Sequence, residues 1–255
     1  MNAEAITSAA NPLLKEVRRA VAHGGLTREG YCIAETPHLL EEAVRSGCEI
    51  AAVLLAGDVQ FGAVPPGARV IRLPEALFAA VAATEAPQGV LALVRPPEWS
   101  AADILRGTPL VAVLDGVQEP GNAGAILRSA EAFGATGAVF VKGSANPYNP
   151  KAVRASAGSV FRLPLLAGVP PEEVHTLLAG ATVYAAAPEA TIAVSAADLT
   201  APCAIVIGSE GRGVSAAMRA GAMLVRIPTS GVESLNAAVA AAVLLYEASR
   251  QRSRG

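Results

Sequence analysis

The stretch DGVQEPGNAGAILRSAEAFG contains the first residues whose types and spacing suggest chemistry. Asn122 is a residue type that caps helices, and we expect it to begin the helix here. Gly121, Gly124 and Arg128 then share one stripe of the helix surface. The two glycines have no side chains and lead along the helix to the guanidinium of Arg128. This arrangement predicts a channel in which a ribose or phosphate meets Arg128. The residues alone leave open an ordinary surface pair between Arg128 and Glu131, with the glycines serving helix packing.

The stretch IVIGSEGRGVS places three glycines within six residues, Gly208, Gly211 and Gly213. Such a loop lets backbone N–H groups turn inward towards a ligand. A loop built for phosphate would avoid a carboxylate, so Glu210 among these glycines favours a cationic ligand. The alternative is a flexible turn with a solvated glutamate.

A third stretch, IPTSGVESLNAA, leaves an apolar strand and enters a helix with apolar residues on every side. We therefore expect the first turn of this helix to be buried, with free N–H groups that need partners. Ser234 is the predicted cap, and Asn236 is expected to present its amide inside the protein. Buried polar groups are costly unless they bond a neighbour or a ligand, so the turn is a candidate binding surface.

Two α/β patterns along the chain position these loops. Residues 95–109 carry three prolines and a tryptophan and read as a linker between the two patterns. Apolar strands alternating with helices in the second pattern predict a parallel sheet covered on both faces, whose ligands bind beyond the carboxyl ends of the strands. The expected strands are 31–35, 50–56, 68–73, 89–95, 109–116, 137–143, 181–187, 203–208 and 222–228, and the expected helices are 37–47, 74–83, 122–134, 150–158, 170–180 and a long final helix.

The amino-acid composition favours a globular protein over a membrane protein. The 255 residues are 52% hydrophobic and 16% charged, which is typical of a globular protein. The longest apolar run, Ala237 to Tyr246, is about half of the roughly 20 residues that cross a bilayer, and the N-terminus lacks signal-peptide features. We therefore expect a cytoplasmic protein with no membrane contact.

The cysteines and the charges are less specific. Cys32, Cys48 and Cys203 fit neither a disulfide framework nor zinc spacing and are expected in the core. The net charge of −2 counts mildly against a nucleic-acid partner. Two basic clusters are expected to be solvated helix faces, with phosphate binding as the alternative: Lys15, Arg18 and Arg19, and Arg250, Arg252 and Arg254.

Residues 110–250 closely resemble the SpoU, or TrmH-type, RNA ribose methyltransferases of the SPOUT superfamily. The resemblance lies in NAGAILRSAEAFGATGAVF, IVIGSEGRGVS and IPTSGVESLNAAVAAAVLLYEA, in the family's order. ITSAANPLLKEVRRA and YCIAETPHLLEEAV resemble the family's accessory RNA-binding domain, which is similar to certain ribosomal proteins. Here Thr36 follows Glu35, where relatives usually carry glycine, and the basic run before that strand is thin. The expected domains are an RNA substrate-binding domain, 1–98, and a methyltransferase domain, 108–255.

The resemblance implies an α/β protein whose C-terminal parallel sheet forms a deep trefoil knot, with the smaller α/β domain before it. It also implies a homodimer and S-adenosylmethionine bound between the second and third loops, without a metal. The implied adenosine contacts are Gly208, Ile227 and Leu235, and the implied catalytic edge is Asn122, Arg128, Glu210, Ser234 and Asn236.

The implied reaction is attack of an RNA ribose 2′-hydroxyl on the methyl carbon of the sulfonium. A guanidinium stays protonated in proteins, so we expect Arg128 to clamp the target phosphate and stabilise the developing alkoxide, while the proton leaves to that phosphate or to water. Glu210 is expected to balance the sulfonium charge or to orient its loop. Ser234 and Asn236 are expected to position Arg128 and the ribose.

Ribosomal RNA is the expected substrate, with transfer RNA as the alternative. A non-catalytic RNA-binding protein of the same fold is a further alternative. A serine hydrolase is disfavoured because none of the three histidines lies in the three loops, and no GxxxxGKS phosphate loop is present. Methylation of a base is disfavoured only by the resemblance to the ribose branch.

Overall fold

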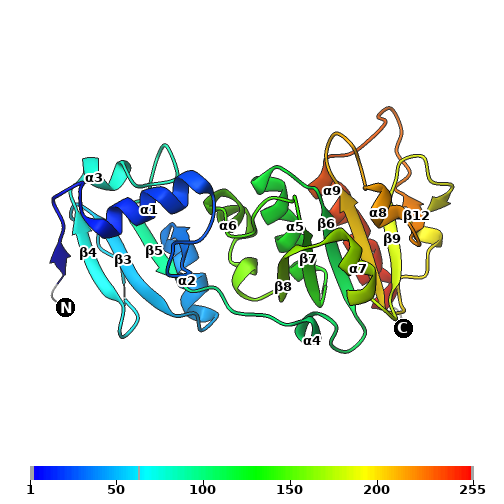
Figure 1. The fold of residues 1–255 in the computed structure, drawn as a ribbon, viewed down its shortest axis with the longest axis horizontal. Coiled ribbons are helices and arrows are strands. Elements are labelled where there is room, and N and C mark those ends of the chain that lie inside the picture. The colour runs from blue at the N-terminus through cyan, green and yellow to red at the C-terminus, as the bar shows by residue number, and fades with distance from the viewer. Residues whose placement is uncertain (1–2, 63, 254–255) are drawn as a thin grey trace. The chain divides into compact units, whose positions relative to one another are not determined.

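The computed structural model describes residues 3–62 and 64–253. The chain forms two compact units. The first comprises residues 1–97 together with 146–162, and the second comprises residues 98–145 and 163–255 (Figure 1). Residues 146–162 therefore cluster with the first unit, although they lie inside the range 108–255 expected for the second domain.

The first unit is built on a five-stranded mixed sheet in the order β1-β4-β3-β5-β2. Strands β1, β4 and β3 are parallel, and β5 runs antiparallel to both β3 and β2. The strands are β1 (Glu4–Ala5), β2 (Cys32–Glu35), β3 (Ile50–Ala56), β4 (Arg69–Leu73) and β5 (Val90–Val94). Sequence patterns predict the last four of these, whereas the two-residue strand β1 is too short to give a pattern.

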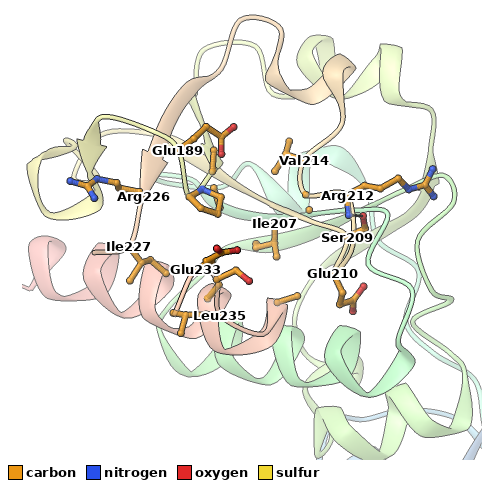
Figure 2. A pocket seen from close by; sticks show the side chains of 18 of the residues that line it. Glu189, Ile207, Ser209, Glu210, Arg212, Val214, Arg226, Ile227, Glu233 and Leu235 are labelled. Atoms are coloured by element: carbon orange, nitrogen blue, oxygen red, sulfur yellow. Dashed lines mark hydrogen bonds between the residues drawn. The ribbon is translucent and has the colours of Figure 1, made fainter. Parts of the chain in front are cut away.

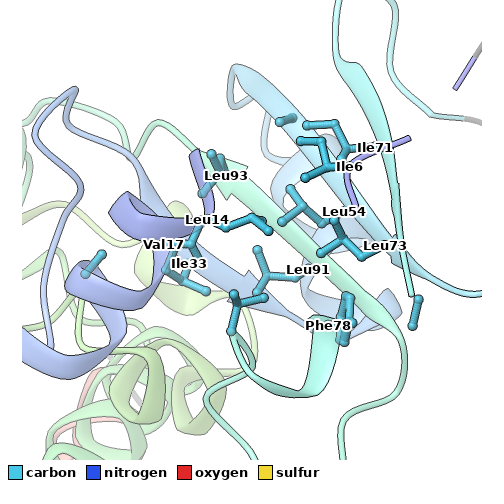
Figure 3. Close-up of a cluster of buried hydrophobic side chains, with 14 residues drawn as sticks. Ile6, Leu14, Val17, Ile33, Leu54, Ile71, Leu73, Phe78, Leu91 and Leu93 are labelled. Carbon is cyan, nitrogen blue, oxygen red and sulfur yellow. The ribbon is translucent and has the colours of Figure 1, made fainter. Parts of the chain in front are cut away.

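Helix α1 (Pro12–His23) covers one face of this sheet (Figure 1). Asn11 caps its start by accepting a hydrogen bond from the Leu13 N–H, and Gly24 ends it with a φ of 64°. Its buried Leu14 and Val17 belong to one apolar cluster with Leu54 and Leu91 of the sheet (Figure 3). The remaining helices of the unit are α2 (Pro37–Arg45), α3 (Glu75–Ala79), α6 (Pro150–Ser156) and the short η1 (Ser159–Phe161).

A buried carboxylate attaches residues 146–162 to the rest of this unit. Glu42 is 5% exposed and pairs with Arg45 at 2.6 Å and with Arg162 at 2.5 Å. A Cβ atom added to Gly158 would lie 2.6 Å from the Glu42 Cβ, so glycine is required for this close approach. Helix α6 also packs on β2.

The second unit is built on a seven-stranded sheet in the order β10-β12-β9-β11-β6-β7-β8, with parallel pairing throughout. The central β6, β7 and β11 are almost wholly buried, which confirms the prediction of a parallel sheet covered on both faces. The strands are β6 (Leu110–Asp115), β7 (Gly137–Val141), β8 (Leu165–Val169), β9 (Thr182–Ala186), β10 (Ile192–Ala193), β11 (Cys203–Gly208) and β12 (Met223–Arg226).

Helices α5 (Pro120–Ala132) and α9 (Ala237–Arg252) pack against each other and against β6. On the other face, α4 (Ala101–Ile104), α7 (Pro171–Leu177) and α8 (Ala216–Arg219) contribute to a second apolar cluster, and η2 (Val194–Ala196) follows β10. Because β12 lies beyond β9, the chain must return across the sheet before α9 packs on β11 and β6. The knot implied by the resemblance stays a prediction.

Two expectations about α9 need correction. The helix is not buried all round, because Val239, Val243 and Tyr246 are 50%, 37% and 54% exposed on one side of it. Its tail is also less solvated than expected. Arg250 pairs with Glu247, and Arg252 donates to the carbonyl oxygens of Leu199, Thr108, Pro109 and Ala201, while Arg254 lies outside the described residues.

The cysteines are free. Cys32 and Cys203 are buried as predicted, and Cys48 is half-buried. Burial raises the pKa of the Cys48 thiol to about 11 and that of Cys32 further still, so neither thiol is activated. Within residues 3–62 and 64–253, the helices all fall short of the length and apolarity that crossing a membrane requires.

Candidate cofactor and substrate site

A pocket with a volume of ≈ 410 Å³ opens at the carboxyl ends of β9, β11 and β12 (Figure 2). This volume lies in the range of about 300–1,000 Å³ typical of small-molecule sites. The lining comes from the loops that follow these strands and from the start of α9, and includes residues 186–189, 207–214, 225–227, 229, 233–235, 237 and 240. The second and third loops expected from the sequence therefore meet at one site.

The glycine-rich loop after β11 is closed by its own backbone. The Gly213 N–H donates to the Ser209 carbonyl at 2.9 Å, and the Ser209 N–H donates back to Gly213 at 3.1 Å. A Cβ atom on Gly208 would lie 2.1 Å from the Gly213 carbonyl carbon. Gly208 is thus required for the loop to close, and it also lines the pocket.

Asp115, the last residue of β6, holds the far end of the same loop. Its carboxylate is 6% exposed and accepts a hydrogen bond from the Ser215 N–H at 2.6 Å. Asp115 was not among the site residues expected from the sequence. The sequence signal that could have identified Asp115 is an acidic residue at the end of an otherwise apolar strand.

A chain of side-chain hydrogen bonds joins all three loops. Asn236 donates from Nδ2 to Asn122 Oδ1 at 3.1 Å, and Asn122 donates from Nδ2 to Glu210 Oε1 at 2.7 Å. Asn236 Oδ1 meanwhile accepts from the backbone N–H groups of Ala238 and Val239. Since both ends of the Asn236 amide are engaged, its orientation is fixed.

Ser234 and Asn236 do not hold the positions expected for them at the start of α9. Asn236 is the cap of α9, and Ser234 lies before the helix as an exposed residue that lines the pocket. The first turn is also only partly buried, because Ala237 is buried whereas Val239 is 50% exposed, and the cap Asn236 is exposed as well. Asn236 accepts hydrogen bonds from the first N–H groups of α9 while it is exposed, so the start of the helix does not require a buried binding site.

The cap of α5 also differs from the expected one, which was Asn122. The helix begins at Pro120 with Glu119 as its cap, so Asn122 is the third helical residue and its amide is free to reach the other loops. Gly124 is buried within the unit, which rules out the predicted open channel along the helix. Arg128 is exposed on the same helix.

Glu210 is held in its charged form. Partial burial acts to raise the pKa of its carboxyl, but hydrogen bonds from the Asn122 side chain and from nearby backbone N–H groups outweigh burial and lower it. One of these donors is the Gln118 N–H at 3.4 Å. Glu210 therefore ties the second loop to the first as an anion.

The eight residues singled out from the sequence divide into two groups. Gly208, Glu210, Ile227, Ser234 and Leu235 line the pocket, whereas Asn122, Arg128 and Asn236 do not. Asn122 and Asn236 nevertheless connect to the pocket through Glu210.

Other charged residues line the pocket without having been expected from the sequence. Glu189 follows β9 and pairs with Arg219. Arg212, Arg226 and Glu233 also contribute. These residues lie at or after the carboxyl ends of strands in one parallel sheet, and this position in the sequence is the signal that could have identified them.

The lining fits S-adenosylmethionine. Ile207, Val214, Val225 and Leu235 provide apolar surface for a nucleoside, and the carboxylates suit a molecule that carries a sulfonium and an ammonium. Among the residues that the structure describes, no cluster of three histidine, cysteine or acidic side chains is placed to hold a metal.

Comparisons with known proteins agree over nearly the whole chain. Residues 109–246 match the model of the SpoU rRNA Methylase family, and residues 11–92 match that of the MRM3-like substrate binding domain. The 23S rRNA (guanosine(2553)-2′-O)-methyltransferase RlmP of Bacillus subtilis (strain 168) is 33% identical over 245 residues, which are 94% of this chain and 97% of that protein.

Two solved structures share the fold. The SpoU methyltransferase AviRb from Streptomyces viridochromogenes, in complex with the cofactor AdoMet, superposes with a TM-score of 0.85 at 30% identity, covering 96% of this chain and 99% of that one. An AdoMet-bound rRNA methyltransferase from Sinorhizobium meliloti gives a TM-score of 0.83 at 26% identity, covering 97% and 98%.

Proposed function

Because the chain belongs to the SpoU rRNA methylase family, we propose that it transfers a methyl group from S-adenosylmethionine to a ribose 2′-hydroxyl of ribosomal RNA. The observation that carries this proposal is the hydrogen-bond chain Asn236–Asn122–Glu210, which joins three strand-end loops around one pocket. The names of RlmP and of the Sinorhizobium meliloti protein support ribosomal RNA over transfer RNA.

The pocket residues hold the cofactor. Gly208, Ile227 and Leu235 contact its adenosine part, largely through backbone groups, and S-adenosylmethionine supplies an electrophilic methyl group. The protein's contribution to rate is to hold the 2′-hydroxyl in line with that methyl group, which can lower the barrier by several kcal/mol. The hydrogen-bond chain serves this purpose because it fixes the loops relative to one another.

Arg128 acts on the RNA. Its exposed guanidinium on α5 clamps the phosphate of the target nucleotide and stabilises the alkoxide that develops at the 2′-oxygen. The proton leaves to that phosphate or to water, since a guanidinium does not accept it. Ser234, exposed at the pocket, positions the ribose.

The division of labour follows the two family matches. A substrate-binding domain, residues 1–98, binds the RNA, and residues 108–255 carry out methyl transfer. The reaction takes place in the cytoplasm.

The active form is a homodimer that covers the exposed side of α9. Val239, Val243 and Tyr246 are spaced by four and three residues and share one face of the helix, and Tyr246 makes an edge contact with Phe133, the residue that follows α5. Such an apolar stripe is typical of a protein interface. Sedimentation of the wild type should show a dimer, and Val243→Glu should shift it to a monomer. A monomeric wild type at tens of micromolar would refute this part of the proposal.

The function is tested with ribosomal RNA from cells that lack the gene. A 2′-O-methyl group blocks alkaline cleavage at its own position, so one protected nucleotide of wild-type RNA should become cleavable. Purified protein with S-adenosylmethionine should restore protection at that nucleotide. Unchanged ribosomal RNA together with a lost 2′-O-methyl group in transfer RNA would favour the transfer RNA alternative. No change in either RNA would contradict the proposal.

A further inference from the structure

Three carboxylates line the pocket, and two of them are already engaged by the protein. Glu189 pairs with Arg219. Glu210 accepts hydrogen bonds from the Asn122 side chain and the Gln118 N–H. Among the described residues, the third carboxylate, that of Glu233, makes neither a hydrogen bond nor an ion pair.

The placement of Glu233 also differs from that of the other two. Figure 2 shows Glu233 near the middle of the pocket, beside Ile207 and above Leu235, whereas Glu189 lies above it at the edge of the drawn residues and Glu210 lies to its right. The guanidinium groups of Arg212 and Arg226 point away from the centre in the same view. The free negative charge of the pocket is therefore concentrated at Glu233.

A carboxylate in this position discriminates between ligands that differ by one positive charge. S-adenosylmethionine carries a sulfonium, and the product S-adenosylhomocysteine has a neutral thioether in its place. Both molecules keep the same ammonium and carboxylate groups, so a charge near the sulfur is felt by only one of them.

We propose that Glu233 is the counter-charge of the sulfonium and makes the pocket prefer S-adenosylmethionine over its demethylated product. This inference rests on the proposed methyltransferase function. The sequence pattern favoured Glu210 for this role, but the carboxylate of Glu210 is instead occupied in joining the loops. After methyl transfer the attraction disappears, which favours release of the product.

The size of the effect follows from exposure. Glu233 is exposed at the pocket, so water screens its charge and the preference should be modest. An exposed pair of opposite charges at contact distance corresponds to about a fivefold change in affinity. We therefore expect Glu233→Gln to weaken S-adenosylmethionine binding about fivefold and to leave S-adenosylhomocysteine binding unchanged.

Titration calorimetry of the full chain tests this with three ligands. Sinefungin is the third, because an ammonium replaces its sulfonium, and Glu233→Gln should weaken its binding as it weakens that of S-adenosylmethionine. Glu189→Gln is the matched control, since Glu189 is already paired with Arg219, and it should leave the ratio of the two main affinities at its wild-type value. Glu233→Asp keeps the charge and should retain most of the preference.

The outcomes separate this inference from the proposed function. Equal weakening of both main ligands by Glu233→Gln would place the carboxylate at the shared ammonium and overturn the inference alone. Unchanged affinities would also overturn it. A wild-type protein that binds none of the three ligands would overturn the proposed function itself. Thermal melting of each variant identifies one that fails to fold, in which case Glu233→Asp and Glu233→Ala provide the comparison.

Discussion

The junction between β2 and α2 in the first unit and the loop that leads into α9 in the second unit both begin a helix with a polar cap. Thr36 accepts one hydrogen bond, from the Leu39 N–H at 3.2 Å, and its backbone φ is 142°. Asn236 caps with an unstrained φ of −53° and also donates to Asn122. The first cap has only a local role, whereas the second is part of the site.

The difference explains why the two positions tolerate different residues. The φ and ψ of Thr36, 142° and 153°, fall in a region that is essentially restricted to glycine, so glycine would be free of strain at this position. Threonine here combines a strained backbone with a useful cap. No comparable substitution suits Asn236, because its amide must both accept and donate.

The largest expected effect is that of Asn236. Asn236→Ala removes the helix cap, at about 1 kcal/mol, and also releases Asn122. Misplacement of a reacting group by about 1 Å can cost about 100-fold in rate, and we expect a loss of this order. Methyl transfer to ribosomal RNA is the measurement.

Asn236→Asp separates the two roles. Aspartate caps a helix as well as asparagine does but lacks the Nδ2 donor. Its stability should stay near that of the wild type while methyl transfer falls as in Asn236→Ala. Wild-type activity in Asn236→Asp would reduce Asn236 to a cap like Thr36.

Arg128 gives the next largest effect and lies outside the hydrogen-bond chain. Arg128→Lys keeps the charge but loses the planar pair of donors that fits a phosphate. Methyl transfer should fall about tenfold or more, and the affinity for S-adenosylmethionine should not change. Activity near wild type would exclude the clamp.

The effects at Thr36 are smaller and should have opposite signs. Thr36→Ala loses the cap and keeps the strain, so it should destabilise the protein by about 1 kcal/mol. Thr36→Gly relieves strain of about 1–3 kcal/mol. It also loses a few tenths of a kcal/mol because glycine is a slightly weaker cap, and about 0.4–1 kcal/mol because the unfolded chain becomes more flexible. A net gain of about 1 kcal/mol is expected.

Urea unfolding, with hydrogen exchange of the α2 amides, measures both Thr36 variants. Two variants that destabilise equally would show that Thr36 is not strained. RNA binding of Thr36→Gly, compared with wild type, tests whether this position affects substrate affinity as well.

The smallest effect is the pH dependence at Glu210. Its pKa in the folded protein is below the ordinary value of 4.5, so its contribution to stability is present above that value and is lost as pH falls through the folded pKa. The difference in unfolding free energy between wild type and Glu210→Gln should be constant near neutral pH and shrink below about pH 4.5. Asn122→Ala should raise the pKa of Glu210, which NMR titration of the carboxyl carbon measures.

Local patterns predict most of the fold. The bounds of β3 and β11 agree with the prediction, because both are apolar runs that end at a turn. β8 was missed because its exposed Ala167 and Gly168 interrupt the apolar pattern, and β10 because it has two residues. The SpoU fold class is confirmed by the family and structure comparisons.

The features that the sequence did not predict depend mainly on contacts between residues far apart in the chain. Residues 146–162 read as part of the second pattern, yet Glu42 and Gly158 place them in the first unit. The helix caps were misassigned because several residues near each helix start are good caps. The three loops were predicted, but the bond between Asn236 and Asn122, 114 positions apart, depends on the folded sheet.

The most direct test is titration calorimetry of S-adenosylmethionine with the wild type and with Asn236→Ala. If the hydrogen-bond chain builds the cofactor site, the wild type binds and Asn236→Ala binds at least about tenfold more weakly while remaining folded. Equal affinity in the two proteins would contradict the role of the chain, and no binding to either would contradict the methyltransferase assignment itself.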